Sequence, residues 1–432
     1  MSTSQWSFNK SSTLNNLDAS NSEITFVPAS EYKTLTIKDN LTGSGTFNLN
    51  TNIAENKSDK IIVKGTAEGN HKIRVTNQGA NVANGKVTLV ETNGGNAAFS
   101  LTNPNNRVDL GAYQYFLTKE GNNWVLAHSK NAVTSNTPVL PSTPLLSDLA
   151  NAQVSLRQAQ LLLVEDDLSG IHQRLGEVKN GEKGNVWVRN VNSRQKLAAL
   201  STGESETSGF KQNVHSVQVG ADAAVTDNLR VGGFVGRSQA NVDFNGHYGD
   251  GKVRSNSVGL YAAYLADNGI YVDNIVKYSR LHANSDHTEK RHYNAYTISS
   301  ELGKRFSLAN DWTITPQAHL AWTHISSQEN EDSLSSVYSR IGLRVAKGFA
   351  LSNGWNLQPY AEVNAVTSKN RSSKIHYANS ALDVASSRGR FESAVGLNAG
   401  FANHRFGLEV SRADGKNFDK PYAIQAVYRY QW

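Results

Sequence analysis

The residues best suited to chemistry in this sequence are Asn151 and Ala152. An asparagine side-chain amide can attack its own backbone carbonyl and release the next residue. Ring closure is easiest when that next residue is small, as Ala152 is. The pair therefore predicts a candidate self-cleavage point near the start of an expected helix, leaving residues 152–432 as the C-terminal product. The alternative interpretation is that Asn151 is an ordinary polar helix residue.

Three histidines form the other cluster of reactive side chains. His282, His287 and His292 are spaced five apart in a segment expected to be a loop. Five-residue spacing aligns them neither on one face of a helix nor on one face of a strand, so a solvated loop is favoured over a metal site. The signatures GxSxG, HExxH and GxxxxGK[ST] are all absent. The sequence therefore predicts no metal, no cofactor and no enzyme beyond a single-turnover cut.

The composition narrows the class of protein. The chain has 432 residues and a net charge of +6, and its 43 basic residues are scattered through alternating segments, which argues against a nucleic-acid groove. The absence of cysteine suits a chain that crosses an oxidising compartment unfolded. No stretch reaches the roughly 18 apolar residues of a membrane helix. Met1 to Lys10 lack the apolar core of a signal peptide, so Met1 is expected to begin an artificial or processed fragment.

Residues 1 to about 130 alternate short apolar pairs with turns such as Gly43-Ser44-Gly45. This alternation predicts a β-solenoid with irregular rungs, which we expect to be the end of a longer solenoid. The alternative is a β-sandwich. Residues 131–144 contain three prolines and are expected to be a linker. The alternating apolar residues are Ile24, Phe26, Leu35, Ile37, Phe47, Leu49, Ile61, Val63, Ile73, Val75, Val87 and Leu89.

Residues 145–183 contain the expected helix. Ser147 or Asp148 can cap its start, and Gly170 weakens its middle. Its apolar residues recur every three or four positions, as on one face of a helix. They are Leu149, Ala152, Leu156, Ala159, Leu163, Leu168, Ile171 and Leu175. An amphipathic helix packed on a core is the simplest interpretation of the pattern in isolation.

Residues 184–432 change to a period of two. In the stretch Ile314–Trp322, apolar Ile314, Ala318 and Leu320 alternate with polar residues, and about twelve such segments follow one another. Most exceed the roughly 9–11 residues that a tilted strand needs to span a bilayer. In the last segment one face is almost wholly aromatic or apolar: Tyr422, Ile424, Ala426, Tyr428, Tyr430 and Trp432.

The connections between these segments differ in length. One set is short, including Asp267-Asn268-Gly269 and Ser352-Asn353-Gly354, whereas Ser285 to His292 and Thr367 to Ser387 are expected to be long polar loops. Short turns on one side and long loops on the other are typical of a transmembrane β-barrel. Aromatic residues near segment ends would supply interfacial girdles. A soluble β-sandwich, the alternative, also alternates but rarely keeps strands this long.

Four stretches, in order, resemble the C-terminal part of pertactin-like autotransporters, the type Va secretion proteins. Val108 to Tyr115 with Gly121 to Leu126 resemble the end of the passenger. Pro144 to Ala152 with Gln173 to Glu177 resemble the linker helix. The other two are found in the barrel: Val231 to Gly236 with Gly259 to Tyr264 resemble early strands, and Tyr428 to Trp432 the terminal insertion signal.

The resemblance implies an all-β fold: a 12-stranded antiparallel transmembrane β-barrel plugged by an α-helix, preceded by a truncated right-handed β-helix. It implies four segments: passenger end with an autochaperone-like terminus (1–130), linker (131–144), pore-spanning helix (145–183) and outer-membrane barrel (184–432). The implied function is type V secretion of an adhesin-like or virulence passenger to the surface of a Gram-negative cell. The barrel would insert as a monomer. Its implied partners are outer-membrane lipid, the barrel-assembly machinery, periplasmic chaperones and, through the passenger, a host surface or other cells.

The resemblance also assigns roles to particular residues. Tyr428, Tyr430 and Trp432 would form the barrel-assembly signal. The polar face of the pore helix would consist of Glu165, Asp166, Asp167 and Arg174, because charged groups suit a wet lumen and not lipid. Some autotransporters cut their own linker, and here Asn151-Ala152 would be the point of cleavage, with lumen-facing Asp273 and Glu362 assisting proton transfer.

Two other functions compete with a secretion pore. One is a carrier of an enzymatic passenger whose active site lies upstream of this sequence. The other is a free-standing barrel adhesin or channel whose loops do the work. A helix that blocks the pore would distinguish the secretion pore from the channel, because its removal should raise conductance.

Overall fold

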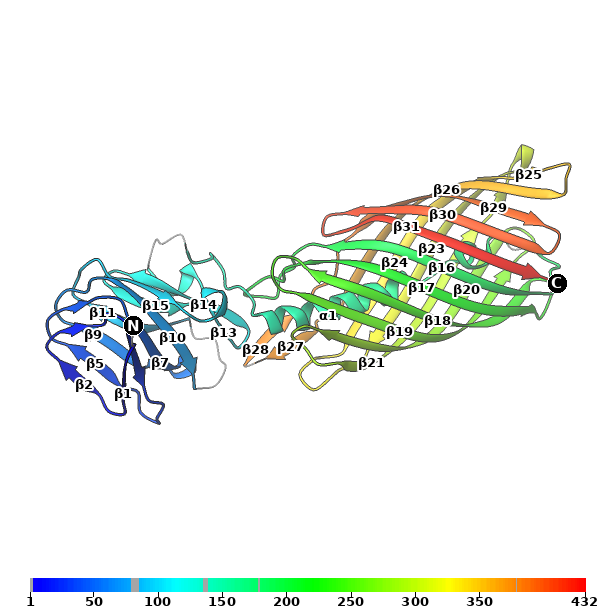
Figure 1. Cartoon of the computed structure of the whole chain (residues 1–432). Coiled ribbons are helices and arrows are strands. Elements are labelled where there is room, and N and C mark those ends of the chain that lie inside the picture. The colour runs from blue at the N-terminus through cyan, green and yellow to red at the C-terminus, as the bar shows by residue number, and fades with distance from the viewer. Residues whose placement is uncertain (1–2, 79–84, 135–138, 178, 378) are drawn as a thin grey trace. The chain divides into compact units, whose positions relative to one another are not determined.

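Both parts of the fold are built mainly of β-strands (Figure 1). Along these strands, buried and more exposed side chains largely alternate. The computed structural model describes residues 3–78, 85–134, 139–177, 179–377 and 379–432; the predicted linker 131–144 therefore falls partly outside the described residues. The chain forms two compact units. The first contains residues 1–150, 203–206 and 376–382, and the second contains 151–202, 207–375 and 383–432.

The first unit is a β-solenoid of stacked parallel strands. One sheet has the order β1-β4-β7-β10-β12, and the other runs β2-β5-β9-β11 before turning antiparallel. The offsets between paired residues vary, since Ile24 faces Phe47 and Phe47 faces Ile73. The irregular rungs predicted from the sequence are thus confirmed. The strands are β1 Ser4–Phe8, β2 Ser12–Leu14, β3 Leu17–Asp18, β4 Ser22–Phe26, β5 Thr34–Ile37, β6 Leu41–Thr42, β7 Thr46–Asn52, β8 Lys57–Ser58, β9 Lys60–Val63, β10 Asn70–Asn77, β11 Lys86–Thr92 and β12 Ala98–Leu101.

The solenoid core lies between its two sheets. Ile24, Leu35 and Phe47 are completely buried. An aromatic series also follows the coil, in which His71 contacts Phe47 on one side and Phe99 on the other. The apolar members of the alternating pairs therefore form the core, as the sequence predicts.

An antiparallel cap ends the solenoid. β11 pairs in parallel with β9 on one edge, but on its other edge it pairs with β15 in the antiparallel sense. β15 then pairs with β14, and β14 with β13. The three cap strands are β13 Val108–Leu110, β14 Tyr113–Glu120 and β15 Asn123–Ala127. They cover the edge that parallel stacking would otherwise leave open.

The second unit is a closed ring of twelve long antiparallel strands. Each strand pairs with its neighbour along the chain, and β16 pairs with β31, which closes the ring. The strands are β16 Gly184–Leu197, β17 Phe210–Ala224, β18 Leu229–Phe244, β19 Asp250–Leu265, β20 Ile270–Ser285, β21 Arg291–Lys304, β23 Trp312–Ile325, β24 Leu334–Lys347, β26 Trp355–Asn370, β29 Arg390–Phe401, β30 His404–Gly415 and β31 Phe418–Gln431. A closed barrel leaves no free edge.

The ring's short connections lie at one end and its longer ones at the other. Residues 402–403 and 266–269 are examples of the short end, whereas residues 198–209 and 371–389 span the long end. The minor strands are β22 Phe306–Ser307, β25 Phe349–Ala350, β27 Lys374–Tyr377 and β28 Ser380–Asp383. The connection expected from Ser285 to His292 is shorter than predicted, because β20 and β21 extend into it.

Two helices connect the solenoid to the barrel strands. α1 is Asp148–Asp166 and α2 is Ile171–Leu175. The sequence predicts one helix over this region, but the structure divides it at residues 167–170. No helix among the described residues is long and apolar enough to cross a membrane.

Candidate functional site: the occupied lumen

Helix α1 lies inside the barrel. Every residue from Asn151 to Glu165 is buried, on all faces of the helix. Its polar side chains contact the long connections at the barrel's rim: Arg157 Nη2 donates to the backbone oxygen of Asp332 (2.7 Å) and Gln158 Nε2 to that of Ala385 (3.1 Å). A helix with so many polar groups can be buried only where the surrounding wall is also polar.

The four residues predicted to form the polar face of the helix all contact the barrel wall. Glu165 accepts a hydrogen bond from Ser368, and Asp166 pairs with Lys420 Nζ at 2.8 Å. Asp167 and Arg174 belong to the segment after α1. Asp167 accepts hydrogen bonds from the hydroxyls of Ser216 and Ser238, both at 2.7 Å. Arg174 Nη2 forms an ion pair with Asp273 Oδ1 at 2.7 Å.

The pair Arg174–Asp273 is the most deeply buried of these. The Arg174 side chain has no exposed surface, and Asp273 has 1%. The guanidinium also lies over the Tyr261 ring, 4.2 Å from its centroid. Since a buried charge is strongly destabilising without its partner, this pair fixes α2 against β20.

Gly170, in the break between α1 and α2, lies close against the barrel wall. A Cβ added at Gly170 would lie 2.3 Å from Glu301 Oε2 and 3.0 Å from Arg340 Nη2. Those two side chains are themselves an ion pair at 3.1 Å. A residue with a side chain cannot approach this pair as closely, so the glycine lets the chain pass the wall where the helix ends.

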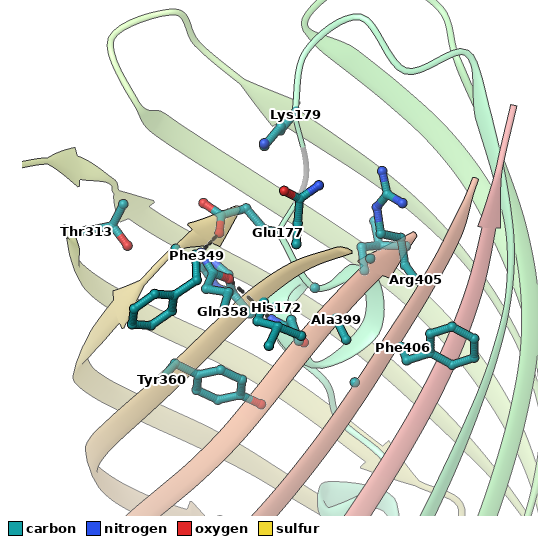
Figure 2. Close-up of a pocket in the computed structure, with 18 of the residues that line it drawn as sticks. His172, Glu177, Lys179, Thr313, Phe349, Gln358, Tyr360, Ala399, Arg405 and Phe406 are labelled. Atoms are coloured by element: carbon teal, nitrogen blue, oxygen red, sulfur yellow. Dashed lines mark hydrogen bonds between the residues drawn. The ribbon is translucent and has the colours of Figure 1, made fainter. Parts of the chain in front are cut away.

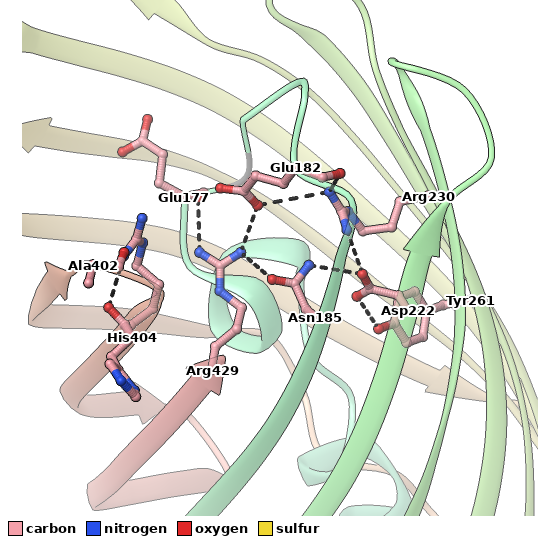
Figure 3. A network of polar contacts seen from close by, with 10 residues as sticks. Glu177, Glu182, Asn185, Asp222, Arg230, Tyr261, Ala402, His404 and Arg429 are labelled. Atoms are coloured by element: carbon pink, nitrogen blue, oxygen red, sulfur yellow. Dashed lines mark hydrogen bonds and ion pairs between the residues drawn. The ribbon is translucent and has the colours of Figure 1, made fainter. Parts of the chain in front are cut away.

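The chain leaves the lumen at the short-turn end through a polar clamp (Figure 3). Arg429 donates to Glu182 and Asn185 (both 3.3 Å) and to the backbone oxygen of Glu177 (3.2 Å). Arg230 donates to the backbone oxygen of Glu182 and pairs with Asp222 at 2.7 Å. The segment between α2 and β16 is thus held by strands from opposite ends of the barrel sequence.

Beside α2 a cavity of about 420 Å³ remains open (Figure 2). His172 and Glu177 face it from the inner segment, and Tyr360 and Arg405 from the wall. Gln358 donates a hydrogen bond to Glu177 across it. The cavity has room for about 14 waters at roughly 30 Å³ each, but not for a further folded element.

The residues proposed for self-cleavage lie apart. Asn151 is at the long-loop end, where its amide nitrogen donates to Ser208 Oγ (2.9 Å) and its oxygen accepts from the Ser208 backbone (2.8 Å). Asp273 contacts Arg174 of α2, and Glu362 accepts hydrogen bonds from Gln173 and Gln317. The structure does not bring these carboxylates to the Asn151-Ala152 peptide.

The three C-terminal aromatic residues face outward on the closing strand. Tyr428 hydrogen-bonds His404 at 2.7 Å and contacts the ring of Phe406. The Trp432 backbone oxygen accepts from the amides of Lys183 and Gly184. The residues predicted to form the barrel-assembly signal therefore belong to the seam where β31 meets β16.

The histidines are placed differently from the sequence expectation. His282 is in β20 and His292 in β21, where they face one another with ring centroids 4.4 Å apart; only His287 is in the connection. The strands extend further than predicted, because the turn signal marks only the residues between them. Within the described ranges, no group of three metal-ligating side chains gathers.

Several lumen residues were not singled out by the sequence analysis. Lys420, Asp222, Arg230, Glu301 and Arg340 all face inward. Lys420 pairs with Asp166 of the inner segment, whereas Arg230–Asp222 and Arg340–Glu301 are ion pairs between wall strands. Period-two alternation identifies such residues as inward-facing. It does not identify which strands lie opposite one another across the lumen, so the ion pairs could not be predicted from the sequence.

A closed barrel whose lumen holds a helix of its own chain defines the class: a membrane translocator joined to a segment that precedes it. Residues 186–411 match the family described as autotransporter beta-domain, and residues 14–128 match the pertactin family. The chain therefore belongs to the autotransporter family, with a pertactin-type passenger segment before its barrel. Its barrel is an outer-membrane domain and its passenger segment is surface-exposed.

Individual relatives agree with this assignment. The BrkA autotransporter of Bordetella pertussis is 28% identical and matches 99% of this chain but 43% of its own length. The pertactin autotransporter of Bordetella bronchiseptica is 29% identical over 94% of this chain and 49% of its own. The chain thus spans less than half the length of these two relatives. A more distant relative is named as a serine protease.

One solved structure supports the fold. The transport unit of the autotransporter AIDA-I from Escherichia coli superposes with a TM-score of 0.50 at 16% identity, over 65% of this chain and 98% of that structure. At this low sequence identity the similarity shows only that the two proteins share an architecture.

Proposed function

We propose that this chain is the secretion end of an autotransporter that delivers its own N-terminal passenger to the cell surface. The observation that carries the proposal is the path of the chain through the lumen. Asn151 contacts the long-loop end, and Asn180, beyond α2, contacts the short turn at Asp267. Because long loops face the outside of an outer-membrane barrel, the segment preceding α1 emerges on the external side.

The remaining parts of the proposal follow from this path. Segments 1–130, 131–144, 145–183 and 184–432 act as passenger end, linker, plug and pore. The barrel inserts as a monomer with the aid of the barrel-assembly machinery and periplasmic chaperones. The passenger acts by binding a host surface or other cells, and not as an enzyme, an assignment supported by a solenoid that offers long exposed strand faces.

The test combines topology with conductance. Intact cells expressing the chain behind a signal peptide are treated with external protease, and the outer membrane is then run on gels with and without boiling. We expect residues 1–130 to be digested and a protected barrel to change mobility on boiling. A passenger that resists external protease but is digested after the cells are opened would refute the proposed orientation.

Conductance distinguishes a plugged translocator from a channel. The matched variant begins at residue 176 behind the same signal peptide, so that the lumen is emptied while the strands remain. We expect low conductance in planar bilayers for the whole chain and a large increase for the deletion. High conductance in the whole chain would favour a free-standing channel instead.

Self-cleavage at Asn151 remains a separate proposal. Cyclisation uses the amide nitrogen, so Asn151→Asp should abolish any split between residues 151 and 152. Intact-mass measurement of outer-membrane fractions would detect the product 152–432. A split that persists in Asn151→Asp would exclude this mechanism, and Ser208→Ala provides a control that frees the amide without removing it.

A further inference from the structure

The outer surface of the barrel changes from apolar to basic within one residue step on the β18–β21 wall. Cross-strand register defines an outward apolar row of six residues. Val235 is 59% exposed in this row, and Tyr296 is 49% exposed. Such exposure on a membrane barrel marks the lipid-facing belt. The row is Val188, Val219, Val235, Val258, Tyr278 and Tyr296.

In the next outward row on the long-loop side, arginines alternate with asparagines: Arg237, Asn256, Arg280 and Asn294. Arg237 follows Val235 on β18, and Arg280 follows Tyr278 on β20. One step further out, Arg254 faces His282, and His282 faces His292, on three neighbouring strands. We call Arg237, Arg254, Arg280, His282 and His292 the basic face; β18 to β21 adjoin one another in Figure 1.

The basic face has no acidic partners of its own. Arg254 Nε donates to the Gln239 amide oxygen at 3.2 Å, which is a neutral acceptor. Among the residues that the structure describes, no carboxylate lies within ion-pair distance of Arg237, Arg254 or Arg280. Three arginines close together on one exposed surface, with no carboxylate paired to them, favour an anion from outside.

The opposite wall shows the contrast. On β30 the outward residues are apolar up to Val410, and the following Arg412 is held by Asp414 at 2.7 Å. On β26 Lys369 is a single outward cation. Unpaired basic residues therefore gather on one side of the barrel and are not a general feature of its rim.

We propose that the basic face binds the phosphorylated head group of an outer-leaflet lipid whose acyl chains lie on the apolar row below it. The row is continuous with the face, so a single amphiphile contacts both. The long-loop end is the external side, which places the basic face at the outer leaflet. Arginine binds phosphate oxygens in a two-pronged manner, and the aromatic pair Tyr278–Tyr296 lies where head groups begin. A soluble phosphate or an acidic peptide would leave the apolar row unused.

The test uses the purified full chain in a zwitterionic detergent, with bisphosphorylated lipid A as the probe and native mass spectrometry as the readout. We expect lipid binding that weakens roughly tenfold in Arg237→Gln/Arg280→Gln, given the strength of cation contacts at anionic lipid surfaces. Arg237→Lys/Arg280→Lys should retain most of it. The control with the same charge change, Lys369→Gln/Arg412→Gln, should bind like the unaltered chain.

Two further measurements distinguish lipid phosphate from free phosphate and test the contribution of the acyl chains. Lipid A stripped of its phosphates should bind as weakly as the double glutamine variant, and inorganic phosphate at the same concentration should not displace the lipid. Equal loss in both double variants, equal binding of the stripped lipid, or displacement by inorganic phosphate would each overturn the proposal. The boiling-dependent gel shift verifies that every variant is folded.

Discussion

At the scale of single residues, buried charged side chains hold the helical plug in the lumen. Arg174 and Asp273 form an ion pair at 2.7 Å, and neither has another ion pair among the described residues; both have almost no contact to solvent. Removing one member of such a pair leaves a buried charge uncompensated. Replacing both by apolar residues removes the charge altogether and is often tolerated.

We therefore expect Arg174→Leu to destabilise the plugged barrel by about 3–5 kcal/mol, and Arg174→Leu/Asp273→Leu to recover much of that loss. The measurement is the temperature at which the boiling-dependent mobility change occurs, together with single-channel conductance. A double variant as unstable as the single one would show that the pair does not act through its charge.

His71 is the residue at which we expect the solenoid to sense acid. Burial lowers the pKa of His71 in the fold. The neutral ring donates from Nε2 to the Glu68 oxygen (2.9 Å) and accepts at Nδ1 from the Gly45 amide (3.3 Å). A proton on Nδ1 would face a donor, so the folded state resists protonation.

Because the folded pKa is depressed, the unfolded chain takes up the proton first, and stability falls as the pH drops below about 6.5. We expect His71→Asn to flatten the pH dependence of the urea midpoint between about pH 6.5 and 5. Circular dichroism of the full chain follows the transition. An unchanged slope in this variant would assign the acid sensitivity to other groups, among them His128, whose pKa burial also lowers.

At the scale of the elements, aromatic side chains of some barrel strands pack over glycines of the neighbouring strand. Tyr271 lies directly opposite Gly303, and Tyr360 directly opposite Gly396. A Cβ at Gly303 would lie 2.4 Å from the Tyr271 ring, and one at Gly396 would lie 2.3 Å from Tyr360. An aromatic ring over a strand glycine fills the missing side chain and fixes the register.

We expect Gly303→Ala to lower the yield of heat-modifiable barrel and its melting temperature, because the Tyr271 ring and its hydrogen bond to Glu301 must move. Gly389→Ala is the matched control, since its Cβ would meet only one atom, at an ordinary 3.5 Å. Equal behaviour of the two variants would contradict the role of the ring.

At the scale of the whole molecule, closure depends on two strands far apart in sequence. Val186 of β16 faces Tyr430 of β31, and the amides of Lys183 and Gly184 donate to Trp432. We expect deletion of Tyr430 to Trp432 to reduce the amount of barrel in the outer membrane severely, because the seam loses its last pairs. Density-gradient fractions measure the loss. Normal insertion of a separate Trp432→Phe variant would show that an aromatic terminus suffices, whereas normal insertion of the truncated chain would refute the role assigned to these residues.

The sequence predicted the architecture of the fold far better than the side-chain contacts inside the barrel. Period-two alternation identified the outward face of β31 and the inward position of Glu362, since alternation is a local property of a strand. The close approach of Gly170 to Glu301 and Arg340 at the division of the helix was missed, because it joins residues more than a hundred positions apart. The same holds for Arg429 and Arg230: their sign and facing can be read locally, but their shared partner Glu182 cannot.

The antiparallel cap formed by β13, β14 and β15 has a consequence for the direction of secretion. Since β15 occupies the free edge of β11, new rungs can be added to the solenoid only on its N-terminal side. Each rung that forms outside buries apolar residues and is then too thick to re-enter a lumen that already holds a helix. If the chain is secreted in the proposed orientation, we expect the solenoid to act as a one-way ratchet, in which thermal motion supplies the movement and folding prevents its reversal.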